Sequence, residues 1–312
     1  FGRNIFAITD PTLGTLRKIA NEAQAKDKLS FRNLPLLPGV GGRYSELNMG
    51  LLHLAIIGVN IKEVLAGARQ MFHACQSPSV GENPAYMYAA LHTILYSAKH
   101  KSIAVIMPFA EGLKATADWY VQLLAESLGK KFERRIEVGL AGIEKWYPDK
   151  KVAVNVGRTP IACRGTNDLH SVQQNNVQGE NNKAVTFIRV ERFKSELRAP
   201  GKEPNFIAGK KFSELMKLAQ TATEWALVRE NRPNCTIILP ELSAFTWGQL
   251  LFFFEMATAF EAELLNVNAF DQPGVEGYKN YMYYKLRKPG LPREVAVEID
   301  KHPLIKKKKF II

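Results

Sequence analysis

Short apolar runs alternate along the chain with longer stretches in which apolar residues recur every three or four positions. An uninterrupted apolar run is typical of a strand that a parallel sheet buries on both faces, and the three-to-four spacing indicates an amphipathic helix. The predicted strands are 4–9 (NIFAIT), 102–109 (SIAVIMPF), 183–190 (KAVTFIRV) and 235–242 (CTIILPEL). Helices are predicted at 13–25, 84–100, 111–130, 212–229 and 247–260. Three further helical segments are less fully bounded: an apolar segment that follows the glycine turn at 38–46 and continues to about residue 68, a helix that opens in 165–174, and a last helical arm that starts in 270–279. Because strands alternate with helices, we predict the α/β class, as a three-layer sandwich with a largely parallel sheet covered by helices on both faces.

The composition indicates a folded chain with a substantial core, because 46% of the 312 residues are hydrophobic. The longest uncharged stretches, 47–61 and 242–254, are shorter than the roughly 20 apolar residues that cross a bilayer, so we expect no membrane partner. The three cysteines, Cys75, Cys163 and Cys235, are far apart in the sequence, which argues against a disulfide framework and against a zinc site. We expect a cytoplasmic location and no metal.

The charge is unbalanced, with 42 basic and 30 acidic residues and a net charge of +12. Such an excess favours anionic partners in general. The only dense basic run is Lys306–Lys309, and no interleaved aromatic residues or recognised binding module accompany it. A solvated tail is therefore favoured over a nucleic-acid patch, and no nucleic-acid partner is expected.

The stretch FDQPGVEGYK (270–279) reads as the start of a helix. Pro273 suits the first helical position, where its missing N–H would be unpaired anyway, and Asp271 or Gln272 can occupy the cap. Lys279 follows Gln272 by seven residues, so both side chains would lie roughly on one face and could contact a ligand near the helix start. The alternative is a capped surface helix with a solvated lysine.

The stretch PGVGGRYSELN (38–48) combines a glycine-rich turn with an arginine. Gly39, Gly41 and Gly42 permit a sharp turn with close backbone approach. Arg43 directly after them offers a fixed fork of donors for an oxyanion or a phosphate. An ordinary surface turn is the alternative.

Two further stretches carry residues suited to proton transfer. In QLLAESLGK (122–130), Gln122, Glu126 and Lys130 are spaced to lie on one side of a helix, so Glu126 is either a base near the helix end or part of a Glu–Lys surface pair. In GTNDLHSVQQ (165–174), His170 falls in the first turn of a helix that the preceding Asn-Asp pair can cap. A lone histidine there is either an acid or a structural residue.

These four stretches, in this order, resemble the glucose-6-phosphate isomerase family. FDQPGVEGYK matches the family's lysine-bearing signature at essentially every position, and VGGRYSELNMG matches its arginine-bearing signature. ESLGK and GTNDLHSVQQ resemble the segments that carry the base and the histidine. The resemblance runs over the whole chain and implies the sugar-isomerase fold. It also implies an aldose–ketose isomerase that interconverts glucose 6-phosphate and fructose 6-phosphate through a cis-enediolate, without cofactor; use of mannose 6-phosphate is left open.

The resemblance also implies a role for each matching residue. Glu126 would be the base that carries a proton between C2 and C1 of the open-chain sugar, and Arg43 would stabilise the cis-enediolate. His170 and Lys279 would assist ring opening, and Lys279 would alternatively hold sugar oxygens. The residue types fit this chemistry, because removal of a proton next to a carbonyl needs a positioned carboxylate and a cation beside the developing oxyanion.

The remaining implied contacts concern the substrate phosphate and a second subunit. Gln272 would help to hold the phosphate, and Gly42 is expected to border the substrate. The family is typically a homodimer in which the histidine segment of one chain completes the active site of the other. His170 is therefore expected to serve the neighbouring subunit.

The family pattern also implies a division of the chain into domains, and this sequence departs from that pattern at one point. We expect 1–50 to be a remnant of a first sugar-isomerase domain, 51–268 to be a second such domain, and 269–312 to be a C-terminal helical arm. Family members carry a Ser-Gly-Thr-Thr phosphate-binding loop ahead of the strand that reads NIFAIT here, and these 312 residues contain no comparable loop. The chain is thus expected to lack the N-terminal part, which weakens phosphate binding because backbone N–H groups at a helix start are a main way to hold it.

Two alternatives to an active isomerase therefore stay open. One is a non-catalytic module that binds a sugar phosphate, since one fold can serve both roles. The other is an inactive fragment of the isomerase. The presence of Glu126 favours the enzyme over the binding module, because a pure sensor needs no base.

Overall fold

The computed structural model describes residues 2–39 and 41–305. The lysine run at 306–309, for which a solvated tail is predicted, lies outside the described residues. The chain divides into two compact units, Phe1–Asp271 and Gln272–Ile312. In the described part of the chain, no helix is long and apolar enough to cross a membrane.

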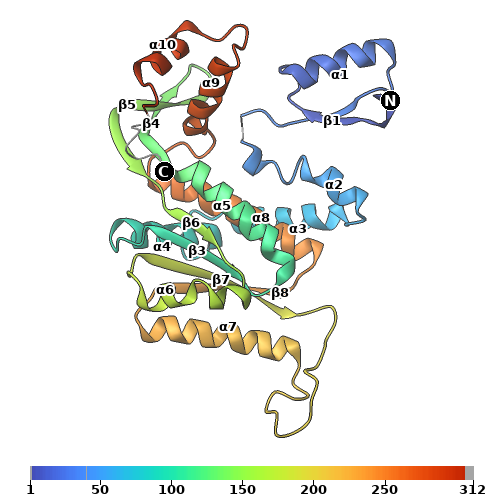
Figure 1. The fold of residues 1–312 in the computed structure, drawn as a ribbon, viewed down its shortest axis with the longest axis vertical. Helices are drawn as coiled ribbons and strands as arrows, with labels where there is room; N and C mark the ends of the chain where they lie inside the picture. The colour runs from blue at the N-terminus through green and yellow to red at the C-terminus, as the bar shows by residue number, and fades with distance from the viewer. Residues whose placement is uncertain (1, 40, 306–312) are drawn as a thin grey trace. The chain divides into compact units, whose positions relative to one another are not determined.

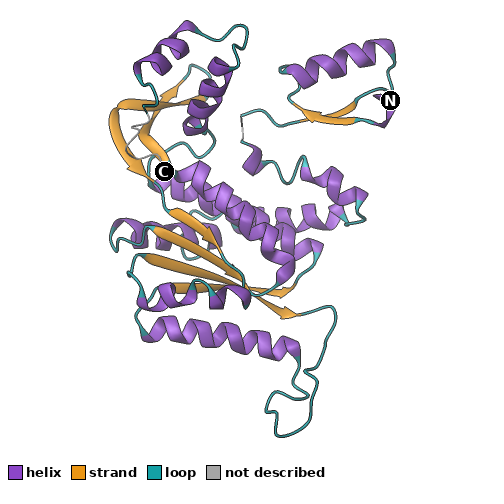
Figure 2. Cartoon of the chain, in the orientation of Figure 1, coloured by secondary structure: helices purple, strands orange, loops and turns teal. Residues whose placement is uncertain are grey.

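A four-stranded parallel sheet forms the centre of the first unit (Figure 1, Figure 2). Its strands have the order β6-β3-β7-β8 and comprise β3 (Ile103–Pro108), β6 (Thr159–Ala162), β7 (Lys183–Arg192) and β8 (Asn234–Glu241). Three of these strands are the apolar runs in which strands are predicted from the sequence. The fourth, β6, is a short edge strand that the pattern does not reveal.

Helices cover both faces of this sheet, and each face has its own hydrophobic core. Along β3, Ala104 and Ile106 belong to one core and Val105 and Met107 to the other, because successive side chains of a strand point to opposite faces. The first core is covered by α4 (Pro84–Ser97), α5 (Lys114–Leu128) and α8 (Ala244–Leu264), and the second by α6 (Gln173–Gln178) and α7 (Phe212–Arg229) (Figure 1). These layers confirm the predicted fold class.

A pair of glycines lets α3 (Ile61–Ala74) cross α8 at close range. A Cβ atom on Gly67 would lie 1.9 Å from the carbonyl oxygen of Phe245, and one on Gly248 would lie 2.1 Å from that of Val64. The two backbones can approach this closely only because neither glycine has a side chain. The crossing fixes α8, which leads at its C-terminal end into the loop 265–271.

The segment before α3 contains a small parallel βαβ unit. β1 (Phe6–Thr9) pairs with β2 (Arg32–Pro35), and α1 (Thr15–Lys26) connects them. The chain then forms the short 3₁₀ turn η2 (Gly42–Tyr44) and α2 (Gly50–Ile56). The apolar helical segment predicted up to about residue 68 thus consists of α2 and α3.

An antiparallel ribbon follows α5 directly and is not predicted from the sequence. It consists of β4 (Lys130–Val138) and β5 (Glu144–Val156). Most of its side chains are exposed, so no continuous apolar run marks either strand. The predicted helix 111–130 is therefore too long at its C-terminal end, because α5 ends at Leu128 and Lys130 is the first residue of β4.

The second unit is helical. It contains the 3₁₀ turn η5 (Pro273–Val275), α9 (Glu276–Lys285) and α10 (Arg293–Lys301). The Tyr284 hydroxyl donates a hydrogen bond of 2.7 Å to the Asp300 carboxylate, which joins α9 to α10.

Candidate functional site

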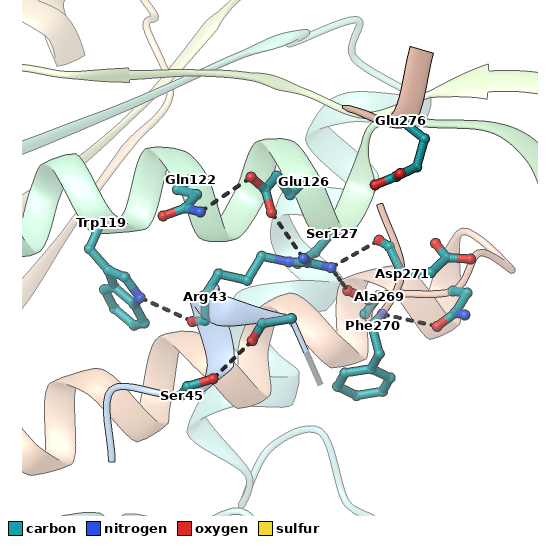
Figure 3. A network of polar contacts seen from close by, with 12 residues as sticks. Arg43, Ser45, Trp119, Gln122, Glu126, Ser127, Ala269, Phe270, Asp271 and Glu276 are labelled. Atoms are coloured by element: carbon teal, nitrogen blue, oxygen red, sulfur yellow. Dashed lines mark hydrogen bonds and ion pairs between the residues drawn. The ribbon is translucent and has the colours of Figure 1, made fainter. Parts of the chain in front are cut away.

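The site is built around Arg43, whose side chain is completely buried in the turn η2. Its Nε atom donates to Ser127 Oγ at 2.8 Å, and Nη1 donates to Glu126 Oε2 at 3.0 Å. Nη2 donates to the backbone carbonyls of Ala269 and Asp271 (Figure 3). One guanidinium therefore joins the glycine turn, the end of α5 and the loop after α8, which are far apart in the sequence.

Glu126 lies in the last turn of α5 and is held from two sides. Oε2 accepts a hydrogen bond from Arg43 Nη1. Oε1 accepts one from Gln122 Nε2 at 3.2 Å, and Gln122 lies one helical turn earlier (Figure 3). The Glu126 side chain is 28% exposed, whereas that of Arg43 is fully covered. The carboxylate is thus oriented by the protein but still reachable from solvent.

Lys130 is a buried part of the site, so the interpretation of Lys130 as half of a Glu–Lys surface pair is wrong. Its Nζ atom donates to the carbonyl oxygens of Glu126 and Asp271, both at 2.6 Å, and lies 3.2 Å from Asp271 Oδ1. Burial lowers the pKa of the Lys130 ammonium, and the Asp271 carboxylate opposes this shift. The ammonium thus links the end of α5 to the loop 265–271, whose carbonyls also accept hydrogen bonds from Arg43.

The local sequence explains why these groups meet. Gly129 ends α5, and a Cβ atom there would lie 2.7 Å from the carbonyl oxygen of Ala125, so a larger residue would not fit. The chain can therefore turn at once and bring Lys130 back under the helix end. On the opposite side, the Tyr44 ring packs against Phe270 with centroids 5.1 Å apart, and Trp119 Nε1 donates to the Arg43 carbonyl at 3.1 Å. These contacts hold the backbone at Arg43 and Tyr44.

Gly42 precedes Arg43 and is exposed. A Cβ atom on Gly42 would have nothing within 4 Å among the described residues. Space is therefore open at Gly42, and the expectation that this glycine borders a substrate stays a prediction.

His170 lies outside this cluster. It ends the 3₁₀ turn η4 (Asn167–His170), and α6 begins only at Gln173, so the prediction that His170 lies in the first turn of an α-helix is wrong. The Asp168 side chain accepts from the backbone N–H of Arg164 at 2.7 Å and so stabilises the turn itself. The His170 side chain is exposed, and within residues 2–39 and 41–305 it forms no hydrogen bond or ion pair.

Gln272 and Lys279 belong to the second unit. Gln272 precedes η5 at the predicted cap position, but its side chain does not cap the turn, and the α-helix begins three residues after Pro273. Lys279 lies on α9 and forms an ion pair of 2.8 Å with Glu276, one turn earlier. This pairing raises the pKa of Lys279.

The sequence-based reasoning missed three contributors to the site. Ser127 and the carbonyl of Asp271 accept hydrogen bonds from the Arg43 guanidinium, and the Trp119 indole donates one to the Arg43 carbonyl. Ser127 and Asp271 are direct neighbours of predicted site residues in the ESLGK and FDQPG stretches, which was the available signal. Trp119 lies two turns before Glu126 on α5, and nothing in the local pattern distinguishes it from a core residue.

The arrangement combines a reachable carboxylate with a buried guanidinium 3.0 Å away. Such a pair is suited to removing a proton next to a carbonyl and to stabilising the resulting oxyanion. Among the described residues, no group of three or more His, Cys, Asp or Glu side chains is arranged to hold a metal ion.

Comparisons with known proteins agree on one family. The family model described as phosphoglucose isomerase matches residues 20–289. Glucose-6-phosphate isomerase from Carboxydothermus hydrogenoformans is 40% identical over 97% of this chain and 62% of the relative. The enzyme of the same name from Symbiobacterium thermophilum is 36% identical over 92% of this chain and 59% of the relative. The chain thus spans about three fifths of the length of these curated relatives.

Two solved structures are also similar. A hypothetical protein from Thermus thermophilus superposes with a TM-score of 0.76 and 31% identity, over 91% of this chain and 63% of that chain. A glucose-6-phosphate isomerase from Chlamydia trachomatis gives a TM-score of 0.74 at 20% identity, over 96% of this chain and 56% of that chain. At 20% identity, the similarity to the second structure shows a shared fold.

Proposed function

The chain belongs to the phosphoglucose isomerase family, and from this premise we propose that it interconverts glucose 6-phosphate and fructose 6-phosphate through a cis-enediolate. The observation that carries the proposal is the pairing of Glu126 with the buried Arg43 at 3.0 Å. Both residues lie in stretches with the family's pattern, and their chemistry is that of an aldose–ketose isomerase.

In this proposal Glu126 takes the proton from C2 of the open-chain aldose. The electron pair of the C–H bond moves into the new C1–C2 double bond, and the carbonyl becomes the oxyanion of a cis-enediolate. Arg43 stabilises that charge because its guanidinium is already fixed by Ser127 and by two backbone carbonyls. The hydroxyl proton on O2 passes to O1, Glu126 returns its proton to C1, and C2 becomes the ketone carbonyl. Gln122 keeps the carboxylate oriented while Glu126 takes and returns the proton.

The other predicted site residues complete the proposal. Lys279 assists ring opening or holds sugar oxygens, Gln272 helps to hold the phosphate, and Gly42 leaves room for the substrate beside Arg43. His170, exposed and without a partner in the described residues, is proposed to reach the site of a neighbouring subunit in a homodimer. No metal or organic cofactor takes part in this scheme.

The proposal extends to the organisation of the protein. We propose that 1–50 corresponds to part of a first sugar-isomerase domain, 51–268 to a second one, and 269–312 to a C-terminal helical arm. A cytoplasmic location agrees with a glycolytic role and with three free cysteines.

The first test is the conversion of fructose 6-phosphate to glucose 6-phosphate, followed with a coupled dehydrogenase. Glu126→Gln keeps the size of the side chain and one acceptor oxygen for Arg43 but removes the base, so kcat is expected to fall by about 10²- to 10⁴-fold while KM changes little. Glu22→Gln, at an exposed position on α1, is the matched control and should leave kcat unchanged.

Other outcomes of this test would count against an isomerase. Binding of fructose 6-phosphate without turnover in the unchanged protein would support the binding module instead. Neither binding nor turnover would support the inactive fragment.

A further inference from the structure

The β4–β5 ribbon turns two covered side chains toward the loop that follows α8. Arg134 on β4 has a side chain that is only 5% exposed, and Trp146 on β5 is half-buried, whereas most other side chains of the ribbon are exposed. The strands are antiparallel, with Arg134 opposite Pro148 and Ile136 opposite Trp146. Arg134 and Trp146 are therefore diagonal neighbours on one face of the ribbon.

Arg134 fixes the ribbon to the end of α8. Its two Nη atoms donate to the two carboxylate oxygens of Glu263, with 2.7 Å between Nη2 and Oε2. Its backbone N–H donates to the carbonyl of Asn266 at 2.8 Å, and Asn266 Nδ2 donates to Glu133 at 3.2 Å. A bidentate pair fixes orientation as well as distance. The start of the loop 265–271 is thus held by β4.

Trp146 continues this contact along the loop through a row of stacked side chains. The Arg134 guanidinium lies over the Trp146 ring, 4.2 Å from a ring centroid. The Trp146 ring packs against Phe270 with centroids 6.0 Å apart, and Phe270 packs against Tyr44 with centroids 5.1 Å apart. Such cation–ring and ring–ring contacts are attractive at these distances. The row therefore runs from the ribbon to the residue that follows Arg43.

Phe270 is the member of this row that bears on the site. It lies between Ala269 and Asp271, whose backbone carbonyls both accept hydrogen bonds from Arg43 Nη2 (Figure 3). Because the three residues are consecutive, a displaced Phe270 ring displaces both acceptors. Tyr44, which Phe270 contacts, is joined to Arg43 by a peptide bond. The row thus holds the surroundings of the guanidinium through side chain acceptors and through the backbone of η2.

We propose that the β4–β5 ribbon positions the Arg43 guanidinium against Glu126, and that Trp146 is the residue that connects the ribbon to the loop 265–271. Trp146 contacts no reacting group, so it is a positioning residue. Without its indole ring, Phe270 and the two carbonyls beside it are held less firmly, and Arg43 follows them. The effect on catalysis rests on the proposed isomerase function, whereas the fixing of the loop and the turn does not.

Three variants separate this role from a general contribution to packing. Trp146→Leu removes the ring but keeps an apolar side chain. Trp146→Phe keeps an aromatic ring in the row but not the indole N–H, which donates to Glu144 at 2.9 Å. Tyr147→Leu is the matched control, because Tyr147 is the next residue on β5, is 39% exposed and contacts Arg135 rather than the loop.

Hydrogen–deuterium exchange of the segments 41–46 and 265–271, followed by mass spectrometry, tests the positioning without any need for activity. The Tyr44 N–H donates to the Gly41 carbonyl at 3.0 Å, and the Val267 N–H donates to the Ala262 carbonyl at 2.9 Å. In Trp146→Leu, exchange of both segments should become faster by about tenfold, because one ring pair and one cation–ring contact are lost. Exchange of β3 and β7 should stay unchanged.

Trp146→Phe and Tyr147→Leu should exchange like the unchanged protein. Unaltered exchange of the two segments in Trp146→Leu, or the same acceleration in Tyr147→Leu, would overturn the proposal. If Trp146→Leu does not fold, Arg134→Gln interrupts the row at its other end and should accelerate exchange of the same two segments.

The kinetic test uses fructose 6-phosphate as the substrate. In Trp146→Leu, kcat should fall by about 10- to 100-fold while KM changes by less than about threefold, because small displacements of a catalytic group slow the chemical step. Trp146→Phe should restore kcat, and an unaltered kcat in Trp146→Leu would overturn the effect on catalysis. Absence of turnover in the unchanged protein would contradict the proposed function alone, and the exchange measurement would still decide whether the ribbon fixes the loop.

Discussion

Arg43 carries a positive charge into a fully buried position, where its environment must supply both charge and hydrogen-bond acceptors. Glu126 supplies the charge, and Ser127 and two loop carbonyls accept three further hydrogen bonds. The planar fork of the guanidinium reaches these groups in different directions at once, which an ammonium cannot do. The residue is therefore expected to determine both the stability of the site and its chemistry.

Replacement of Arg43 by lysine tests this role. Arg43→Lys keeps the charge but leaves several buried acceptors without a donor, so the free energy of unfolding should decrease by about 2–4 kcal/mol. Urea unfolding measures it. Arg135→Lys, at an exposed ion pair, is the control and should change stability by less than about 0.5 kcal/mol. An equal effect of the two substitutions would contradict the assigned role.

Lys130 offers a second test at the scale of single residues. Lys130→Met preserves most of the buried volume but leaves the carbonyls of Glu126 and Asp271 without the ammonium. We expect a loss of about 1–3 kcal/mol in stability and a lower kcat, because the end of α5 that carries Glu126 is no longer held. Lys131→Met, at the exposed neighbouring position, should have little effect on either quantity.

At the scale of elements, the close α3–α8 crossing depends on two glycines, Gly67 and Gly248. Gly67→Ala forces a Cβ atom into the space now 1.9 Å from the carbonyl oxygen of Phe245. The helices must separate, so we expect a loss of about 1–3 kcal/mol, measured by thermal or urea unfolding. Gly50→Ala at the start of α2, where a Cβ atom would meet nothing within 4 Å, should be neutral. A stable Gly67→Ala would show that the crossing is looser than described.

Elements with an uninterrupted apolar run could be predicted from the sequence, and elements without one could not. β3 and β7 are largely buried and β8 is partly buried, and each of the three carries such a run. The β4–β5 ribbon is mostly exposed, so its strands carry no such pattern. The 3₁₀ turn at His170 looks like a helix start because the same polar residues favour both structures.

The residues of the site also divide into those that could be predicted from the sequence and those that could not. Arg43 and Glu126 could be predicted, because each lies in a stretch that resembles a known signature. The burial of Lys130 could not, since it depends on α5 ending at Leu128 and on the chain turning back at Gly129. Because the helical spacing was extended beyond Leu128, where α5 ends, Lys130 was placed on an exposed helix surface.

At the scale of the whole molecule, stability is unevenly distributed over the first unit. The four-stranded sheet is covered by a core on each face, whereas β1 and β2 form a sheet of two strands. Two-stranded sheets are marginally stable on their own. Backbone amides of 6–9 and 32–34 should therefore exchange with solvent much faster than those of β3 and β7, as measured by hydrogen–deuterium exchange. Equal protection in both sheets would contradict this distribution.

The central claim is that Glu126, assisted by Arg43, moves a proton between two carbons of a sugar phosphate. The most direct test is incubation of fructose 6-phosphate with the 312-residue chain in D₂O, with NMR detection of deuterium at carbon. The account predicts deuterium at C1 of fructose 6-phosphate and at C2 of glucose 6-phosphate, and none in Glu126→Gln. No incorporation with the unchanged protein at saturating substrate, or equal incorporation with the variant, would contradict it.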